Sequence, residues 1–258
     1  MKQSHSLRIA IAVATHKAYW MPKDPCYVPL QVGKALHPEL DLGIATDATG
    51  DAISAKNASY CELTALYWLW KNVHADVKGL VHYRRHFTHG HPLVKKHAAV
   101  LKEADWQALF ATADIVVPER REYYIETNRS HYVHAHGARD LIALRESVAR
   151  LYPEALSFFD VQMDRTSAHM FNMMVMREAL FDAYCAWLFP ILADVEQHTD
   201  LTGYDVYQRR VYGFLSELLL DVWLDANGLA YRECPVTFLE RQNWLKKGGS
   251  FLMRKFLR

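Results

Sequence analysis

The sequence predicts one α/β domain in which a mainly parallel sheet is flanked by helices. Short runs of β-branched and other apolar residues alternate with longer segments of helical periodicity, which is typical of parallel strands joined by helices. The 258 residues are 51% hydrophobic, which suffices for one sizeable core. Because the sequence contains no internal repeat and no low-complexity linker, we expect a single domain over residues 1–241, followed by a basic tail over 242–258.

The first third of the chain predicts two buried strands. Residues 7–14 form an apolar run that ends on the polar triplet 15–17. Residues 77–81 form a second run, which ends on the sequence His-Tyr-Arg-Arg at 82–85. Three prolines predict an irregular loop over residues 19–33.

A helix is expected over residues 60–72, between these two strands. Its apolar residues recur at helical spacing, and the turn-rich segment 47–57 precedes it. Ser59 is followed three residues later by Glu62, which is the pattern of a capping box. We therefore expect Ser59 to be the N-cap of this helix.

The rest of the chain predicts further helices and strands around a charged loop. Residues 119–136 are rich in Tyr and His and are expected to form a loop or lid that leads into a helix. The expected helices cover residues 101–112, 140–152, 178–195 and 206–224, and the expected strands cover 114–117 and 168–176.

The adjacent arginines Arg84 and Arg85, at the exit of a core strand, are the most informative feature of the sequence. A desolvated Arg is costly without an anionic partner, and its planar fork of donors binds carboxylate or phosphate oxygens bidentately. In an open α/β sheet the carboxyl ends of the strands form the ligand crevice. Two interpretations follow: a site for a phosphorylated ligand, or pairing with buried carboxylates such as Glu62 or Asp51.

Composition excludes several functional classes. The net charge is +1, with 30 basic and 29 acidic side chains, so nothing supports nucleic-acid binding. The four cysteines include no C-x-x-C pair and are too sparse for a disulfide scaffold, which favours a reduced cytoplasmic setting. No segment approaches the roughly 20 apolar residues that cross a bilayer, so a soluble or peripheral protein is expected.

Six sequence segments together resemble one protein family. They read ATHK (14–17), GDAISAKNASYCELTALYWLWKN (50–72), GLVHYRRHF (79–87), HMFNMMVM (169–176), YCAWLFPIL (184–192) and RVYGFLSELLLDVWL (210–224). Over about residues 9–240 they resemble the bacterial capsule, exopolysaccharide and O-antigen glycosyltransferases formerly catalogued as a domain of unknown function. The resemblance implies a GT-A-like fold and transfer of a sugar, galactofuranose in some relatives, from a UDP-sugar donor to a lipid-linked or polymeric glycan.

The resemblance also implies a donor site built from strand ends and the family-like blocks. Lys17 is expected to contact a phosphate, and Asn172 resembles an Asn that faces the donor sugar in related transferases. For Glu62, the capping role is an alternative. The expected donor-binding residues are Thr15, His16, Lys17, Asp51, Asn57, Glu62, His82, Tyr83, Arg84, Arg85, His169 and Asn172.

No cofactor is expected. GT-A enzymes usually hold a metal ion with an Asp-x-Asp motif at a strand end, and this sequence contains no such motif. Cationic side chains would instead neutralise the leaving diphosphate as its charge develops. The loosely spaced histidines lack a Cys partner or an H-E-x-x-H pattern, so no metal ligands are predicted.

Two carboxylates are candidates for the group that takes the acceptor proton. Asp205 lies at the expected start of the long helix, where it is equally a helix cap. Glu217 lies among apolar residues of the same helix, where burial would raise its pKa, and it is equally a structural partner of the arginines. The residues expected to bind the acceptor are Tyr123, Tyr124, His131 and His136.

The tail combines aromatic and basic residues with no acidic one. This is the composition of an interfacial amphipathic segment, which would dock on the anionic inner face of the cytoplasmic membrane. A terminal helix packed on the domain or on a partner subunit fits the same composition.

Two other functional classes are alternatives to a transferase. A non-catalytic module that binds nucleotide-sugar or glycan within a polysaccharide assembly remains the alternative. A phosphate-handling hydrolase is disfavoured, because the sequence has no Walker loop, no G-x-S-x-G and no H-E-x-x-H.

Overall fold

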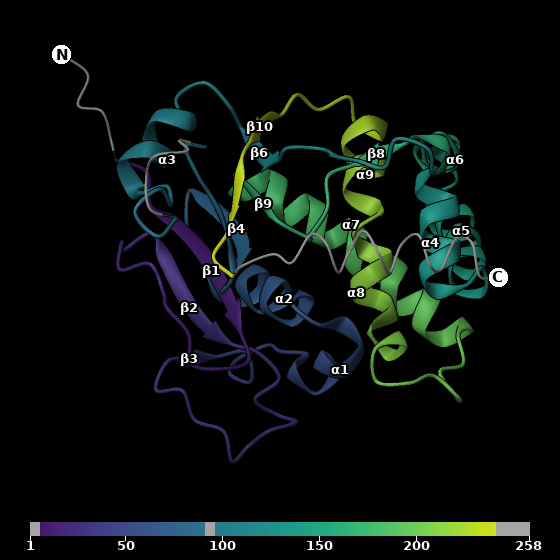
Figure 1. Cartoon of the computed structure of the whole chain (residues 1–258), viewed down its shortest axis with the longest axis horizontal. Coiled ribbons are helices and arrows are strands. Elements are labelled where there is room, and N and C mark those ends of the chain that lie inside the picture. The colour runs from purple at the N-terminus through teal and green to yellow at the C-terminus, as the bar shows by residue number, and fades with distance from the viewer. Residues whose placement is uncertain (1–5, 91–95, 241–258) are drawn as a thin grey trace.

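The computed structural model describes residues 6–90 and 96–240, and one mixed sheet organises them (Figure 1). The expected basic tail lies outside the described residues. The strands are β1 (Ile9–Thr15), β2 (Tyr27–Gln31), β3 (Ala45–Thr46), β4 (Val77–His82), β5 (Arg85–Phe87), β6 (Ile115–Pro118), β7 (Arg121–Glu122), β8 (Ser167–Ala168), β9 (Met174–Arg177), β10 (Arg232–Cys234) and β11 (Val236–Phe238). The α-helices are α1 (Asn57–Tyr60), α2 (Leu63–Asn72), α3 (Glu103–Leu109), α4 (Asn128–His136), α5 (Arg139–Leu151), α6 (Leu156–Asp164), α7 (Glu178–His198), α8 (Val211–Ser216) and α9 (Leu219–Ala226), with 3-10 turns η1 (Ser54–Lys56), η2 (Pro153–Ala155) and η3 (Gln208–Arg210).

The main sheet has the strand order β10-β6-β9-β4-β1-β2-β3. The pairs β1–β2, β1–β4, β2–β3 and β6–β10 are parallel, whereas β9 runs antiparallel to both of its neighbours, β4 and β6. The short strands β5 and β11 pair with each other beyond the end of β4, and β7 and β8 form a separate ribbon. The expectation of a mainly parallel sheet is therefore confirmed.

The two faces of the sheet bury different side chains. Along β1, Ile9, Ile11 and Val13 point to the face covered by α3, where Trp106 is fully buried. The alternate alanines point to the other face, which α2 and the helices α4 to α9 cover (Figure 1). Small side chains on that face allow the helices to approach the strand closely, because alternate residues of a strand face opposite sides. Within the described ranges, no helix is long and apolar enough to cross a membrane.

Strand β2 lies inside the segment predicted to be a loop. Its residue Pro29 is paired in register with Val13 of β1. Proline adopts the extended backbone without strain but cannot donate to a neighbouring strand. The prediction of an irregular loop over residues 19–33 was therefore wrong for β2, because Pro29 removes only part of the hydrogen-bond ladder.

The predicted capping box at Ser59 is wrong. Cys61 has a positive φ of 52°, which separates α1 from α2, and α2 begins after Glu62. The Ser59 hydroxyl donates to the carbonyl of Lys56, and the Glu62 side chain makes no capping bond. The Glu62 carboxylate is therefore free to point elsewhere.

Two other elements are shorter than predicted. The expected helix over residues 206–224 is divided into η3, α8 and α9, with Glu217 at the break between the last two. The expected strand over 168–176 consists of β8 and β9, separated by a turn in which Phe171 and Asn172 have positive φ angles of 79° and 53°. The sequence also gave no indication of α6, β10 or β11.

Candidate functional site

The polar residues at the ends of β1 and β4 come together at one edge of the sheet. Ala14 and His82 are paired in register, and the Tyr83 N–H donates to the Ala14 carbonyl at 3.1 Å. The chain then turns at Tyr83 and Arg84 and returns as β5, which is antiparallel to β4. This turn places two adjacent guanidinium groups at the open end of the sheet, as the sequence predicts for a ligand crevice.

The Arg85 guanidinium is held by aromatic rings, and no described carboxylate lies within ion-pair distance of it. Its Cζ atom lies 4.5 Å from the ring centre of Phe171 and 5.7 Å from that of Phe238. One Nη donates to His82 Nδ1 over a long 3.5 Å, and Nε is buried without a hydrogen-bond partner among the described residues. An unsatisfied buried donor costs about 1–3 kcal/mol, and more when it is charged. Pairing with Glu62 or Asp51, one of the two interpretations of the sequence, is not observed.

Arg84 and Lys17 share a single carboxylate partner. Glu240 Oε2 lies 3.4 Å from Arg84 Nη1, and its Oε1 lies 3.6 Å from Lys17 Nζ. The Lys17 ammonium also lies 5.1 Å from the centre of the Tyr83 ring, which is buried. All three charged side chains are partly exposed. Lys17 and Arg84 thus form a positively charged surface that already contacts the Glu240 carboxylate.

Asn172 holds the Glu62 carboxylate in place. The Asn172 Nδ2 group donates to Glu62 Oε1 at 2.8 Å and to the Gly213 carbonyl at 3.0 Å, and its Oδ1 accepts from the Ser216 hydroxyl at 2.8 Å. The positive φ of Asn172 turns the side chain toward these partners, and Asn tolerates that conformation better than most residues. Both amide hydrogens of Asn172 are thus engaged within the protein.

Glu217 completes a group of opposite charges beside Glu62 and Arg85. Burial raises the pKa of Glu217 to about 7, and the Glu62 carboxylate adds to the rise, whereas Arg85 and Arg121 oppose it. Burial also lowers the pKa of His82, while Glu62 opposes that change. His82 Nε2 lies 2.7 Å from the Phe171 carbonyl, to which the neutral ring donates. His82 can therefore offer its other nitrogen to Arg85.

The sequence did not single out Arg210, which adds positive charge from a distant part of the chain. Its Nε donates to Cys61 Sγ at 3.2 Å, and its guanidinium lies 5.1 Å from the Phe214 ring centre. Burial lowers the pKa of His16, and the charges of Lys17, Arg84 and Arg210 lower it further. Positive side chains from the loop after β1, the β4–β5 turn and the start of α8 thus act together on His16. The contacts of Arg210 depend on tertiary structure and leave no local pattern in the sequence.

Other predicted donor residues form bonds within the fold. The Thr15 hydroxyl donates to the Lys17 carbonyl, and Asn57 donates to the Cys61 carbonyl and to Thr64. The exposed Asp51 accepts from the hydroxyl of Tyr67. These bonds shape the loops around the strand ends.

His169, directly after β8, belongs to a separate buried network with α9 and β10. Its Nδ1 pairs with Asp221, which also accepts two bonds from Arg120, and its Nε2 lies 3.0 Å from Glu233. All of its polar atoms are therefore used away from the strand-end arginines.

The two candidate bases differ in their surroundings. Asp205 is exposed and accepts from the N–H of Gln208, the first residue of the turn η3, at 2.7 Å. No described cation lies within ion-pair distance of it. Glu217, in contrast, is partly buried among the charged groups of the site.

The residues predicted to bind an acceptor lie along α4 and the loop before it. Tyr123 stacks on His131 at a centroid distance of 4.1 Å, and Glu217 contributes to raising the pKa of Tyr123 to about 12, after the larger effect of burial. Tyr124 is 84% exposed, and His136 stacks on Phe214 at 4.2 Å. Tyr123 therefore lies near Glu217, and His136 packs against α8.

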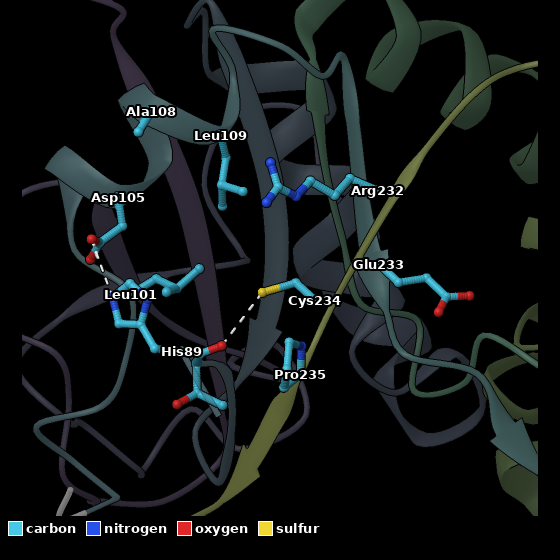
Figure 2. A pocket seen from close by; sticks show the side chains of 10 residues that line it. His89, Leu101, Asp105, Ala108, Leu109, Arg232, Glu233, Cys234 and Pro235 are labelled. Carbon is cyan, nitrogen blue, oxygen red and sulfur yellow. Dashed lines mark hydrogen bonds and ion pairs between the residues drawn. The ribbon is translucent and has the colours of Figure 1, made fainter. Parts of the chain in front are cut away.

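A separate cleft of about 370 Å³ lies between α3 and β10 (Figure 2). Arg232 points into it, and a His89–Asp105 ion pair lies across from it. The lining includes none of the strand-end residues. In residues 6–90 and 96–240, no three His, Cys, Asp or Glu side chains are grouped so that they could hold a metal ion.

Two substitutions should move the pKa of Glu217 in opposite directions. Glu62→Gln removes a like charge and should lower this pKa, whereas Arg85→Met removes an opposite charge and should raise it. Carboxyl ¹³C NMR titration of the two variants measures both shifts, and Asp205→Asn is a control that should cause none. Shifts in the same direction, or none in either variant, would show that these three side chains do not share one site.

Known proteins share this architecture. A family model described as "Domain of unknown function (DUF4422)" matches residues 10–228. The apo structure of the WbbM bifunctional glycosyltransferase is 31% identical, with a TM-score of 0.84, over 91% of this chain and 46% of the WbbM chain. This chain thus spans less than half of WbbM, and no curated protein matches it. The structural match confirms the predicted GT-A-like fold class, and the family match shows that the chain belongs to the DUF4422 family.

Proposed function

We propose that this protein is a glycosyltransferase that uses a nucleoside-diphosphate sugar, with Arg84 and Arg85 binding the diphosphate. The observation that carries this proposal is Arg85, a largely desolvated guanidinium without a carboxylate at ion-pair distance among the described residues. A phosphate oxygen would supply the missing acceptor for its fork of donors. The similarity to WbbM, which is described as a bifunctional glycosyltransferase, supports the same reaction class.

The surrounding cations suit a diphosphate leaving group. Lys17 and Arg84 flank one side of the turn, and Arg210 adds a third positive charge near His16. When the bond between the donor sugar and the diphosphate breaks, negative charge develops on the phosphate oxygens. Fixed donors that are already oriented stabilise this charge without reorganisation.

Glu217 is the better candidate for the group that takes the acceptor proton. Its pKa of about 7 leaves a useful fraction ionised near neutral pH, while the ionised form remains a competent base. The acceptor hydroxyl would lose its proton to Glu217 as its oxygen bonds to the sugar carbon, and the diphosphate would leave. The rate should therefore rise with pH through about 7.

The substrates follow from the family resemblance. We propose a UDP-sugar donor, with UDP-galactofuranose the first to test, and a lipid-linked or polymeric glycan of capsule, exopolysaccharide or O-antigen as the acceptor. We propose that this acceptor is met at the inner face of the cytoplasmic membrane, where the basic tail would bring the enzyme to anionic lipid. A panel of nucleotide sugars tested by thermal shift would identify the donor, since a bound donor raises the melting temperature.

Loss of either strand-end guanidinium should abolish most transfer. Arg85→Ala should lower kcat/KM by on the order of 10²-fold, because a fixed donor to the developing charge is removed. Arg84→Ala should act in the same direction. Radiolabelled transfer from UDP-sugar to a galactose-terminated acceptor measures the effect, and the exposed Arg209→Ala is the matched control. Nucleotide-sugar binding without transfer or donor hydrolysis by the unmodified protein would instead indicate a non-catalytic binding module.

Removal of the Glu240 charge should tighten donor binding. A phosphate between Lys17 and Arg84 must replace the carboxylate that now contacts both. Because partly exposed ion pairs are worth less than about 1 kcal/mol, Glu240→Gln should lower the donor KM by about two- to fivefold with little change in kcat. The exposed Glu119→Gln serves as the control. A higher donor KM in Glu240→Gln would mean that this carboxylate contacts the donor.

Transfer should not require a divalent metal ion, because the arginines and Lys17 are proposed to neutralise the diphosphate. Rates measured before and after treatment with EDTA should be equal. Activity that EDTA abolishes and that manganese or magnesium restores would contradict this role of the cations.

A further inference from the structure

One helical face connects Glu217 to an aromatic surface beside Arg210. Arg210, Phe214 and Glu217 are spaced by four and three residues along α8 and its two caps, so they lie in one row. Gly213 lies beside this row against Cys61, where an added Cβ would come within 3.1 Å of Sγ. The absence of a side chain at Gly213 thus allows α8 to pack close to the residues that hold Glu62.

Three rings form a compact cluster, called the stack below, at the N-terminal part of this row, and the Tyr207 and Phe214 rings are tilted by 45° at a centroid distance of 5.1 Å. The His136 ring lies 4.2 Å from the Phe214 ring and 5.8 Å from the Tyr207 ring, at interplanar angles of 27° and 21°. Gln208 fixes the stack, because its Oε1 lies 3.0 Å from His136 Nδ1 and its Nε2 donates to the Ala135 carbonyl. Tyr207 remains 54% exposed and the preceding Val206 is 87% exposed. The stack is therefore already formed and presents an aromatic surface to solvent.

We infer that this stack, named here the Tyr207 platform (His136, Tyr207 and Phe214), binds a sugar unit of an extended acceptor glycan, given the transferase function proposed above. The face of an aromatic ring is electron-rich and attracts the C–H groups on one side of a sugar ring. The hydroxyl groups at the edge of that sugar would find a polar partner in Arg210, whose Cζ atom lies 5.9 Å from the centre of the Tyr207 ring. An exposed aromatic ring beside a guanidinium group fits a glycan better than a purely apolar ligand.

The distance from Glu217 indicates which sugar unit would bind. Arg210 precedes Glu217 by seven residues, and Tyr207 precedes Arg210 by three residues of a 3-10 turn. At about 1.5 and 2.0 Å per residue, the Tyr207 backbone lies roughly 16 Å along the chain from the proposed base, whereas Phe214 lies one helical turn from it. This span exceeds one sugar ring. The platform would therefore extend from beside the reacting sugar to the unit behind it, and favour polymeric over monosaccharide acceptors.

The dependence of the acceptor KM on acceptor length tests whether the platform binds a sugar unit. Galactose oligosaccharides of one to four units are used as acceptors at a fixed donor concentration. For the unmodified protein, the acceptor KM should fall as the oligosaccharide lengthens. Tyr207→Ala should raise the KM of the longer acceptors by about two- to tenfold and leave the KM of the single sugar and of the donor unchanged. Tyr207→Trp should retain the advantage of length, and Val206→Ala is the matched control.

The outcomes are distinguishable. A KM that does not depend on length, or a Tyr207→Ala effect equal for all acceptors, would overturn the platform while leaving transfer intact. If no acceptor is ever glycosylated, the transferase function fails, and saturation-transfer NMR of the same oligosaccharides then tests the platform. Length-dependent binding that Tyr207→Ala removes would support the platform alone, and unchanged binding would overturn it.

Discussion

A positive charge that is largely withdrawn from water must be compensated, and at Arg85 the described part of the protein does so only in part. Two phenyl rings face the guanidinium and a neutral imidazole accepts one weak bond, but the buried Nε has no described partner. Rings attract a cation by about 0.5–2 kcal/mol, whereas a hydrogen bond to a charged group contributes about 1.5–3 kcal/mol. Among the described residues the acceptor position beside the buried Nε is open, so an incoming anion can supply the missing hydrogen bond.

The surrounding structure maintains this arrangement. The β5–β11 pair brings Phe238 over Arg85, and the turn at Phe171 and Asn172 supplies the second ring. A phenylalanine with positive φ is strained, and such strain persists only where neighbouring contacts enforce it. Here the Phe171 carbonyl accepts from His82, and Asn172 is fixed by Glu62, Gly213 and Ser216. The strained turn thus links the arginine fork to both carboxylates of the site.

Local patterns in the sequence were sufficient to predict the strands that position Arg84 and Arg85. The apolar runs that became β1 and β4 are short, β-branched and buried on both faces, so they predict parallel strands that end at one edge of the sheet. The position of Arg84 and Arg85 at the open end of the sheet follows from where β4 ends. The predictions were wrong where the fold does not follow a local sequence rule. Pro29 indicated a loop but lies within a strand, and Cys61 breaks the helix that Ser59 was expected to cap.

Contacts between distant segments could not be read from the sequence. Phe238, Glu240 and Arg210 reach the site only after β11 has paired with β5 and α8 has packed on Cys61. The predicted role of Asn172 also depended on tertiary detail, because its amide faces Glu62 and the helix α8 within the protein. The spacing of apolar residues was enough to predict where the strands end. The hydrogen-bond partners of the polar side chains could be identified only from the whole fold.

A crystal structure of the protein with bound UDP tests the central claim most directly. The account predicts that the diphosphate lies within hydrogen-bond distance of both the Arg84 and Arg85 guanidinium groups, and that the Glu240 carboxylate has moved away from Lys17. A diphosphate bound elsewhere, with the two guanidinium groups paired to carboxylates of the protein, would contradict it.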